Sequence, residues 1–185
     1  MKLKRAFCCF VFSMFMVFTS VCFAKITDSD LSIGGFYYGE SIEDVIATVG
    51  EPVGESSIGV HERALVFQLK DKSTINIVFE NGFITSIKAV GGSFMTTSAG
   101  IRANSTLQDI INAYGEPDVV DKIGSGANGN DTYSVTYRTE KKSFMHPEYG
   151  EFKQYKTMNF VFSNLGIEWI SFFTNNEFGA QYSVP

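Results

Sequence analysis

The feature that most constrains this chain is a segment that occurs twice. Residues 35–52 read GFYYGESIEDVIATVGEP and residues 100–117 read GIRANSTLQDIINAYGEP. When the two segments are aligned, the leading glycine, the aspartate and the closing Gly-Glu-Pro coincide, and Ile46 matches Ile111. Internal similarity of this kind indicates two copies of one supersecondary unit, because such units stack to bury a shared core.

Each copy predicts a short helix. A hydroxyl residue followed three positions later by aspartate is typical of a helix N-terminus, and apolar residues then recur at helical spacing. Glycine followed by Glu-Pro ends the pattern, because glycine adopts the left-handed conformation and proline cannot continue a helix. The matching positions are Ser41, Asp44 and Gly50 in the first copy, and Thr106, Asp109 and Gly115 in the second.

Alternating apolar residues follow each helix and predict strands. The first copy continues with Leu65–Leu69, Ile75–Phe79 and, after an Asn-Gly turn, Phe83–Val90. The second continues with strands around residues 133–137, 158–162 and 167–173. We therefore predict an α+β fold of two tandem repeats, each a short helix packed on a three-stranded antiparallel β-meander. The short connection at residues 91–98 predicts that both units share one sheet.

The first 24 residues have the pattern of a secretory signal peptide. Lys2, Lys4 and Arg5 precede a run of about 16 apolar residues, shorter than the roughly 20 that span a membrane. We expect cleavage near Ala24 and a periplasmic or secreted protein, and favour this over lipoprotein anchoring at Cys22. The predicted organisation is thus a signal peptide at 1–24, a first unit at 25–92 and a second at 93–185.

Removing this leader changes the chemistry of the chain. All three cysteines lie within it, so the exported protein has neither disulfides nor thiol ligands. Three of the 15 basic residues also lie there, which leaves 12 against 20 acidic residues and a net charge of about −8. Such a chain is repelled by phosphate backbones and anionic lipid surfaces. We expect no nucleic-acid partner and at most peripheral membrane contact.

The repeated helix resembles a known architecture. Ser41, then Asp44-Val45-Ile46, then Gly50-Glu51-Pro52, followed by a meander and repeated in tandem, is similar to the β-lactamase-inhibitor-protein fold. A single-unit version occurs in outer-membrane assembly lipoproteins of the SmpA/OmlA type. The resemblance implies an exported, non-enzymatic protein that binds other proteins. The sequence lacks the inhibitor's cysteines and matches none of its loops, so no contact residue is carried over.

Candidate catalytic residues have simpler interpretations. His61 and His146 are the only histidines, and neither lies in a metal-binding or triad-like pattern. Asp44 and Asp109 look like a carboxylate pair, but their position at the start of each helix explains them as caps. We therefore predict no catalytic residue, no metal site, no cofactor and no enzymatic activity.

The stretch at residues 140–153 is the first candidate binding element. It separates two strands that should pair and is longer than most hairpin loops. It carries Phe144, Met145 and Tyr149 among charged residues, and long loops with aromatic groups are often recognition elements. The alternative is that these side chains fold back onto their own core.

The second candidate is the sheet face opposite the helices. If Ile170 points toward the helix, alternation places Trp169 and Phe173 on the other face, where Tyr155 and Arg138 should join them. An apolar strip there would mark an interaction surface. The alternatives are that the units bury this strip, or that a one-residue register shift reverses the faces.

The sequence therefore favours an exported protein-interaction module, acting through this face and the 140–153 stretch. Its partner would be another exported or envelope protein, and a monomer is expected. The alternative function is a carrier for an apolar small molecule or peptide held between the two units. An enzyme is the third possibility, and would require one of the histidines beside a serine and a carboxylate in a cleft.

Overall fold

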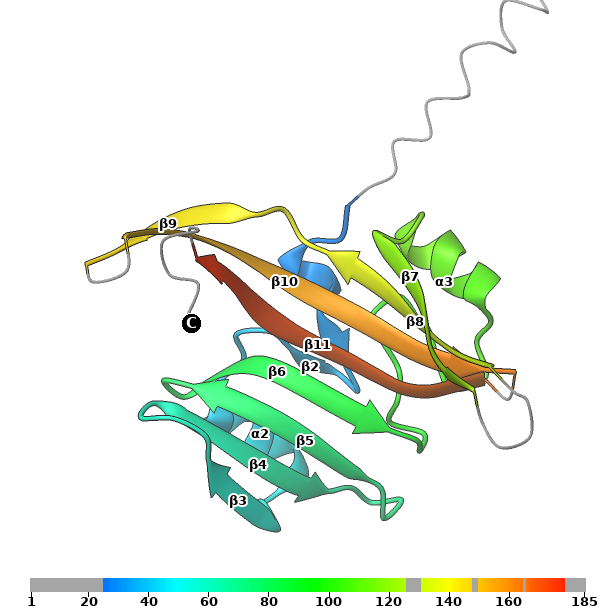
Figure 1. Ribbon diagram of the computed structural model, residues 1–185. Helices are drawn as coiled ribbons and strands as arrows, with labels where there is room; N and C mark the ends of the chain where they lie inside the picture. The colour runs from blue at the N-terminus through cyan, green and yellow to red at the C-terminus, as the bar shows by residue number, and fades with distance from the viewer. Residues whose placement is uncertain (1–24, 126–130, 148–149, 165, 179–185) are drawn as a thin grey trace, which may run out of the picture.

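The computed structural model describes residues 25–125, 131–147, 150–164 and 166–178. The predictions for the leader at 1–24, including Ala24 and Cys22, and for Tyr149 lie outside these residues. One nine-stranded antiparallel sheet forms the body of the protein, and the helices α2 (Ile42–Val49) and α3 (Leu107–Tyr114) lie on one of its faces (Figure 1).

The strands are arranged so that the last two join the two halves of the chain. From one edge to the other the order is β3 (Gly54–Ser57), β4 (Glu62–Gln68), β5 (Thr74–Glu80), β6 (Phe83–Val90), β11 (Gly166–Phe178), β10 (Gly150–Ser163), β8 (Asp131–Arg138) and β7 (Val119–Ser125). The ninth strand, β9 (Lys142–His146), pairs with β10 beyond the end of β8.

This topology corrects the predicted fold class. The sheet is continuous, as the short connection predicts, but it does not consist of two three-stranded repeat units. Val90 of β6 pairs with Trp169 of β11, so the two halves meet inside one ladder of strands. The strands missed by the prediction include β3 and β7, which form the two edges. Their largely exposed residues do not alternate between apolar and polar, which removes the pattern that marks a half-buried strand.

Both helices begin and end where their sequences predict. The Thr106 hydroxyl accepts a hydrogen bond from the Asp109 amide at 3.2 Å, and the Asp109 carboxylate accepts one from the Thr106 amide at 2.8 Å. In α2 the Ser41 hydroxyl likewise accepts from the Asp44 amide at 3.2 Å, and each cap hydroxyl also donates to its aspartate, Ser41 to Asp44 at 2.6 Å and Thr106 to Asp109 at 2.8 Å. Both aspartates therefore have structural roles as caps.

The first-half strands also follow the sequence closely. Asn81 and Gly82 have φ angles of 53° and 86°, the left-handed conformation that a two-residue hairpin turn requires. The turn pairs Glu80 with Phe83, and a register shift between Val78 and Phe79 then brings Ile77 opposite Ile87, both buried in the core. A shift of one residue would expose these side chains.

A single hydrophobic core lies between the sheet and the helices. It includes Val45 of α2, Ile110 of α3 and, between them, Ile87 and Phe160 from the centre of the sheet. The N-terminal segment completes this layer through the short η1 (Asp28–Asp30), β1 (Ser32–Ile33) and β2 (Phe36–Tyr37). Its buried residues are Ile26, Leu31, Ile33 and Phe36. Because the buried residues of both halves belong to one cluster, the halves share their stabilisation.

Candidate binding surface on the outer face of the sheet

The outer face of the sheet is the one turned away from α2 and α3. Ile170 and Phe172 of β11 are buried in the core, so Trp169 and Phe173 point to the outer face. The pairing of Thr157 with both Phe173 and Arg138 continues this row across β10 to β8. The structure therefore brings Trp169, Phe173, Tyr155 and Arg138 onto one face.

Cationic side chains lie over the aromatic rings of this face. Lys88 Nζ is 4.6 Å from the centroid of the Trp169 ring. Arg138 Cζ lies 5.7 Å and Lys141 Nζ 5.1 Å from the centroid of the Tyr155 ring. These distances are typical of cation–π contacts, in which the negative face of the ring attracts the cation. We call Lys88, Trp169, Phe173, Tyr155, Arg138 and Lys141 the cation–aromatic patch.

Several positions between the rings are polar. The Ser134 hydroxyl donates to the side-chain oxygen of Asn159 at 2.8 Å, and the Asn175 amide donates to the Thr157 hydroxyl at 2.6 Å. Ser171 lies between Trp169 and Phe173 and is buried. The face therefore combines hydrogen-bonded polar positions with aromatic and cationic groups, and the buried Val161 lies opposite Trp169.

One carboxylate belongs to the same surface. Glu177 accepts hydrogen bonds from Lys141 Nζ through both oxygens, each at 2.8 Å. This contact lowers the pKa of the Glu177 carboxyl below its usual value. Both side chains are exposed, so the ion pair adds little to stability.

The 140–153 stretch is not a loop, and this prediction is corrected. Its residues form β9 and the start of β10, which pair from Lys142↔Gln154 to His146↔Gly150. Backbone pairing of β9 with β10 extends the ladder of β10 and β11 beyond the main sheet. We call β9 and the paired ends of β10 and β11 the arm.

The arm separates the aromatic residues that the sequence placed together. Phe144 pairs with Phe152, and their rings stack at 5.6 Å between centroids. Phe152 and Tyr155 are an odd number of residues apart, so Phe144 lies on the face opposite the cation–aromatic patch. Met145 pairs with Glu151 and shares the face of Tyr155. Phe144 is 42% and Met145 75% exposed, so neither folds back into the core.

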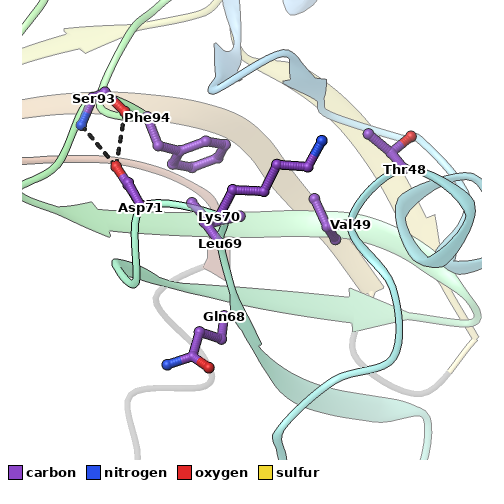
Figure 2. A pocket seen from close by; sticks show the side chains of 8 residues that line it. All are labelled: Thr48, Val49, Gln68, Leu69, Lys70, Asp71, Ser93 and Phe94. Atoms are coloured by element: carbon purple, nitrogen blue, oxygen red, sulfur yellow. Dashed lines mark hydrogen bonds between the residues drawn. The ribbon is translucent and has the colours of Figure 1, made fainter.

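A groove on the helix side is a separate candidate binding site (Figure 2). It lies between the end of α2, the turn from β4 to β5 and the connection after β6, and has a volume of about 320 Å³. Val49, Leu69 and Phe94 give it an apolar lining, and Lys70 extends over it. Asp71 holds one wall by accepting hydrogen bonds from the Ser93 amide at 3.2 Å and hydroxyl at 2.7 Å.

Hydrogen bonds hold the pKa of the Asp71 carboxyl far below its usual value, and the largest contribution is from the Ser73 hydroxyl. Ser93 adds to the effect from the connection after β6. The carboxylate therefore remains charged at neutral pH and fastens the connection to the β4–β5 turn.

Sequence reasoning did not find Lys88 or Lys141 as members of the patch. Lys88 alternates with the buried Ile87 and Ala89, which would have placed it on the outer face. Its contact with Trp169 depends on the pairing of β6 with β11, which joins positions far apart in the sequence. No local pattern signals that pairing.

The described parts of the chain contain no group of three or more histidine, cysteine or acidic residues placed to hold a metal ion. His61 is exposed and immediately precedes β4, and His146 ends β9. Within residues 25–178, leaving aside the short gaps, no helix is long and apolar enough to cross a membrane.

Comparison with known proteins gives one structural likeness. No protein-family model and no curated protein matches the chain. An extracellular protein containing a SCP domain from Bacillus anthracis str. Ames is similar to 81% of this chain, with 11% sequence identity and a TM-score of 0.44. The chain spans about half of that protein, 47% of its length.

These findings correct the family resemblance drawn from the repeat. No family model links the chain to β-lactamase-inhibitor proteins or to SmpA/OmlA-type lipoproteins. The single nine-stranded sheet also differs from the tandem three-stranded units on which the resemblance depended. The residues behind it, such as Ser41, Asp44 and Gly50, form a helix cap and a helix end. Those features recur in unrelated proteins because they meet general backbone requirements.

Proposed function

We propose that this protein is an exported, non-enzymatic module that binds another exported or envelope protein through the cation–aromatic patch. The observation that carries the proposal is the gathering of Trp169, Phe173 and Tyr155 with three cations on the face turned away from the helices. Tryptophan, tyrosine and arginine are the residues most enriched at the energetic centres of protein interfaces.

The physical setting supports a binding role. The rings rise from strands of a large sheet, so binding them requires little ordering of the backbone. Cations at the edge of an interface speed encounter and select partners by charge. In the arm, Met145 extends the same face beyond the main sheet and offers an exposed, adaptable apolar contact.

A capture experiment with matched variants tests the proposal. The tagged protein is incubated with an envelope extract of its host, and bound proteins are quantified by mass spectrometry. Replacing Trp169 and Phe173 with alanine should reduce retention of the bound partner at least about tenfold, as expected for two interface centres. The control replaces Tyr37 and Phe83, two exposed aromatic residues outside the patch, and should retain the partner.

Circular dichroism must show that both double variants are folded. Because Trp169 and Phe173 are half-buried, Lys88→Glu provides a further variant at an exposed position. A patch variant that is folded and retains every bound protein contradicts the proposal.

The groove near α2 supports a second candidate function, the carriage of an apolar small molecule or peptide. Its volume lies at the lower end of the range for ligand pockets, and Val49, Leu69 and Phe94 supply the apolar lining that such pockets share. Native mass spectrometry of protein purified from its host would detect a bound molecule. A ligand lost on Leu69→Glu supports this function, and protein that carries no ligand contradicts it.

A further inference from the structure

We infer that the partner segment recognised by the cation–aromatic patch is a short acidic polypeptide whose carboxylates pair with Lys88, Arg138 and Lys141. This inference rests on the proposed function and adds the chemistry of the partner.

Charge is distributed unevenly over the molecule. The patch and its neighbour Glu177 hold three cations and one carboxylate, a local charge of +2. The whole sequence has 20 acidic and 15 basic residues. Several of the acidic residues lie in the first turns of the two helices, among them Glu43, Asp44 and Asp109. The patch is therefore a positive region on an acidic protein, and an acidic segment is complementary to it.

The cations are held in place before a partner arrives. Lys88 rests on the Trp169 ring, and Arg138 and Lys141 rest on the Tyr155 ring. A ring contacts only one side of a cation, so the remaining donors stay available to a carboxylate. Because the rings already restrict these long side chains, binding loses less side-chain entropy than at freely moving lysines.

Glu177 demonstrates the contact that the patch can make. Its two carboxylate oxygens both accept from Lys141 Nζ at 2.8 Å, while Lys141 remains over the Tyr155 ring. One cation thus contacts a ring and a carboxylate together. An incoming glutamate can occupy the same arrangement at Lys88, for which the described residues provide no carboxylate partner.

The size of the patch favours a short segment over a long polyanion. Trp169 and Phe173 lie four residues apart on β11, a distance of about 13 Å, which an extended peptide spans with about four residues. A long polyanion would reach the acidic regions of the protein and be repelled.

A binding titration with defined peptides tests the inference. Fluorescein-labelled hexaglutamate is titrated with the protein and followed by fluorescence anisotropy, with hexaglutamine as the uncharged comparison. We expect hexaglutamate to bind at about 20 mM salt and to weaken about tenfold at about 200 mM, because exposed ion pairs are screened. Hexaglutamine should not bind.

Charge reversal locates the site. The Lys88→Glu/Arg138→Glu variant should lose at least about tenfold in affinity, because each change replaces attraction with repulsion. The control, Lys70→Glu/Arg102→Glu, replaces the same residue types at exposed positions outside the patch and makes the same change in net charge. It should lose much less. Equal losses in both variants would overturn the inference, since the effect would then come from net charge alone.

Two further outcomes also overturn it. One is the absence of hexaglutamate binding at low salt, and the other is tighter binding of a heparin hexasaccharide, which would assign the patch to an anionic glycan. Neither outcome decides the proposed function by itself. Loss of the partner from the Trp169→Ala/Phe173→Ala variant in the capture experiment would still show a protein-binding face, with a partner recognised by other chemistry.

Discussion

Replacement of Leu65 by alanine tests whether the nine-stranded sheet unfolds as one body. Leu65 lies in β4, is 1% exposed and faces the core beneath α2. Removing a buried leucine side chain leaves a cavity and costs about 3 kcal/mol within a usual range of about 2–5 kcal/mol. With a urea dependence of about 2 kcal/mol per molar for a domain of this size, the midpoint should fall by about 1.5 M.

The assay uses a probe on the other half of the chain. Trp169 is the only tryptophan and lies on β11, with β5 and β6 between it and β4. Its fluorescence should follow the same transition as far-UV circular dichroism, and Leu65→Ala should move both curves equally. Val60→Ala, at a position 93% exposed, should change the free energy of unfolding by less than about 0.5 kcal/mol.

An unchanged Trp169 transition in Leu65→Ala would refute this reasoning. It would mean that the β3–β6 half unfolds independently, and that the pairing of β6 with β11 does not couple the halves. Two separate transitions in the unaltered protein would lead to the same conclusion.

Three further predictions follow from local contacts. Thr106→Ala removes the hydroxyl that caps α3 and should lower the free energy of unfolding by about 1 kcal/mol in urea denaturation, whereas an unchanged midpoint would contradict the capping role. Gly34→Ala should lower the free energy of unfolding more than Gly35→Ala does. Both glycines have positive φ, which costs about 1–2 kcal/mol for alanine. Only at Gly34 would the new methyl group also overlap the Phe94 ring. Equal effects would show that Phe94 moves aside freely. The folded-state pKa of Asp71 is lowered, so its stabilising contribution is present above the unfolded pKa of about 4 and is lost as the pH falls below that value. Asp71→Asn should therefore reduce the loss of stability that urea denaturation measures between about pH 5 and pH 2. An identical pH profile in the variant would contradict this role of Asp71.

The local structure of this protein could be read from its sequence. The caps at Ser41 and Thr106, the glycines that end both helices and the Asn81-Gly82 turn are determined by neighbouring residues, so short-range patterns predict them. Alternation also placed Trp169 and Tyr155 on the outer face. These features depend on backbone geometry within a few residues.

The parts that could not be predicted depend on non-local pairing or on exposure. Val90 and Trp169 are far apart in the sequence, and their pairing leaves no local signature. The edge strands β3 and β7 and the arm have exposed residues, so burial imposes no alternation on them. Arg138 was predicted on this face, but Lys88 was missed, because it meets Trp169 only when β6 and β11 pair. Shared motifs therefore predicted the helices correctly and the number of strands wrongly.

Site-specific photo-crosslinking in the native host tests the proposed binding face most directly. A benzoylphenylalanine replaces Val90, which is exposed beside Trp169 on the outer face, and in a control protein it replaces Tyr37, which is exposed in the N-terminal layer. The account predicts a protein adduct at position 90, attached through a segment rich in aspartate and glutamate, and no such adduct at position 37. Adducts of equal yield at both positions, or none at position 90, would contradict it.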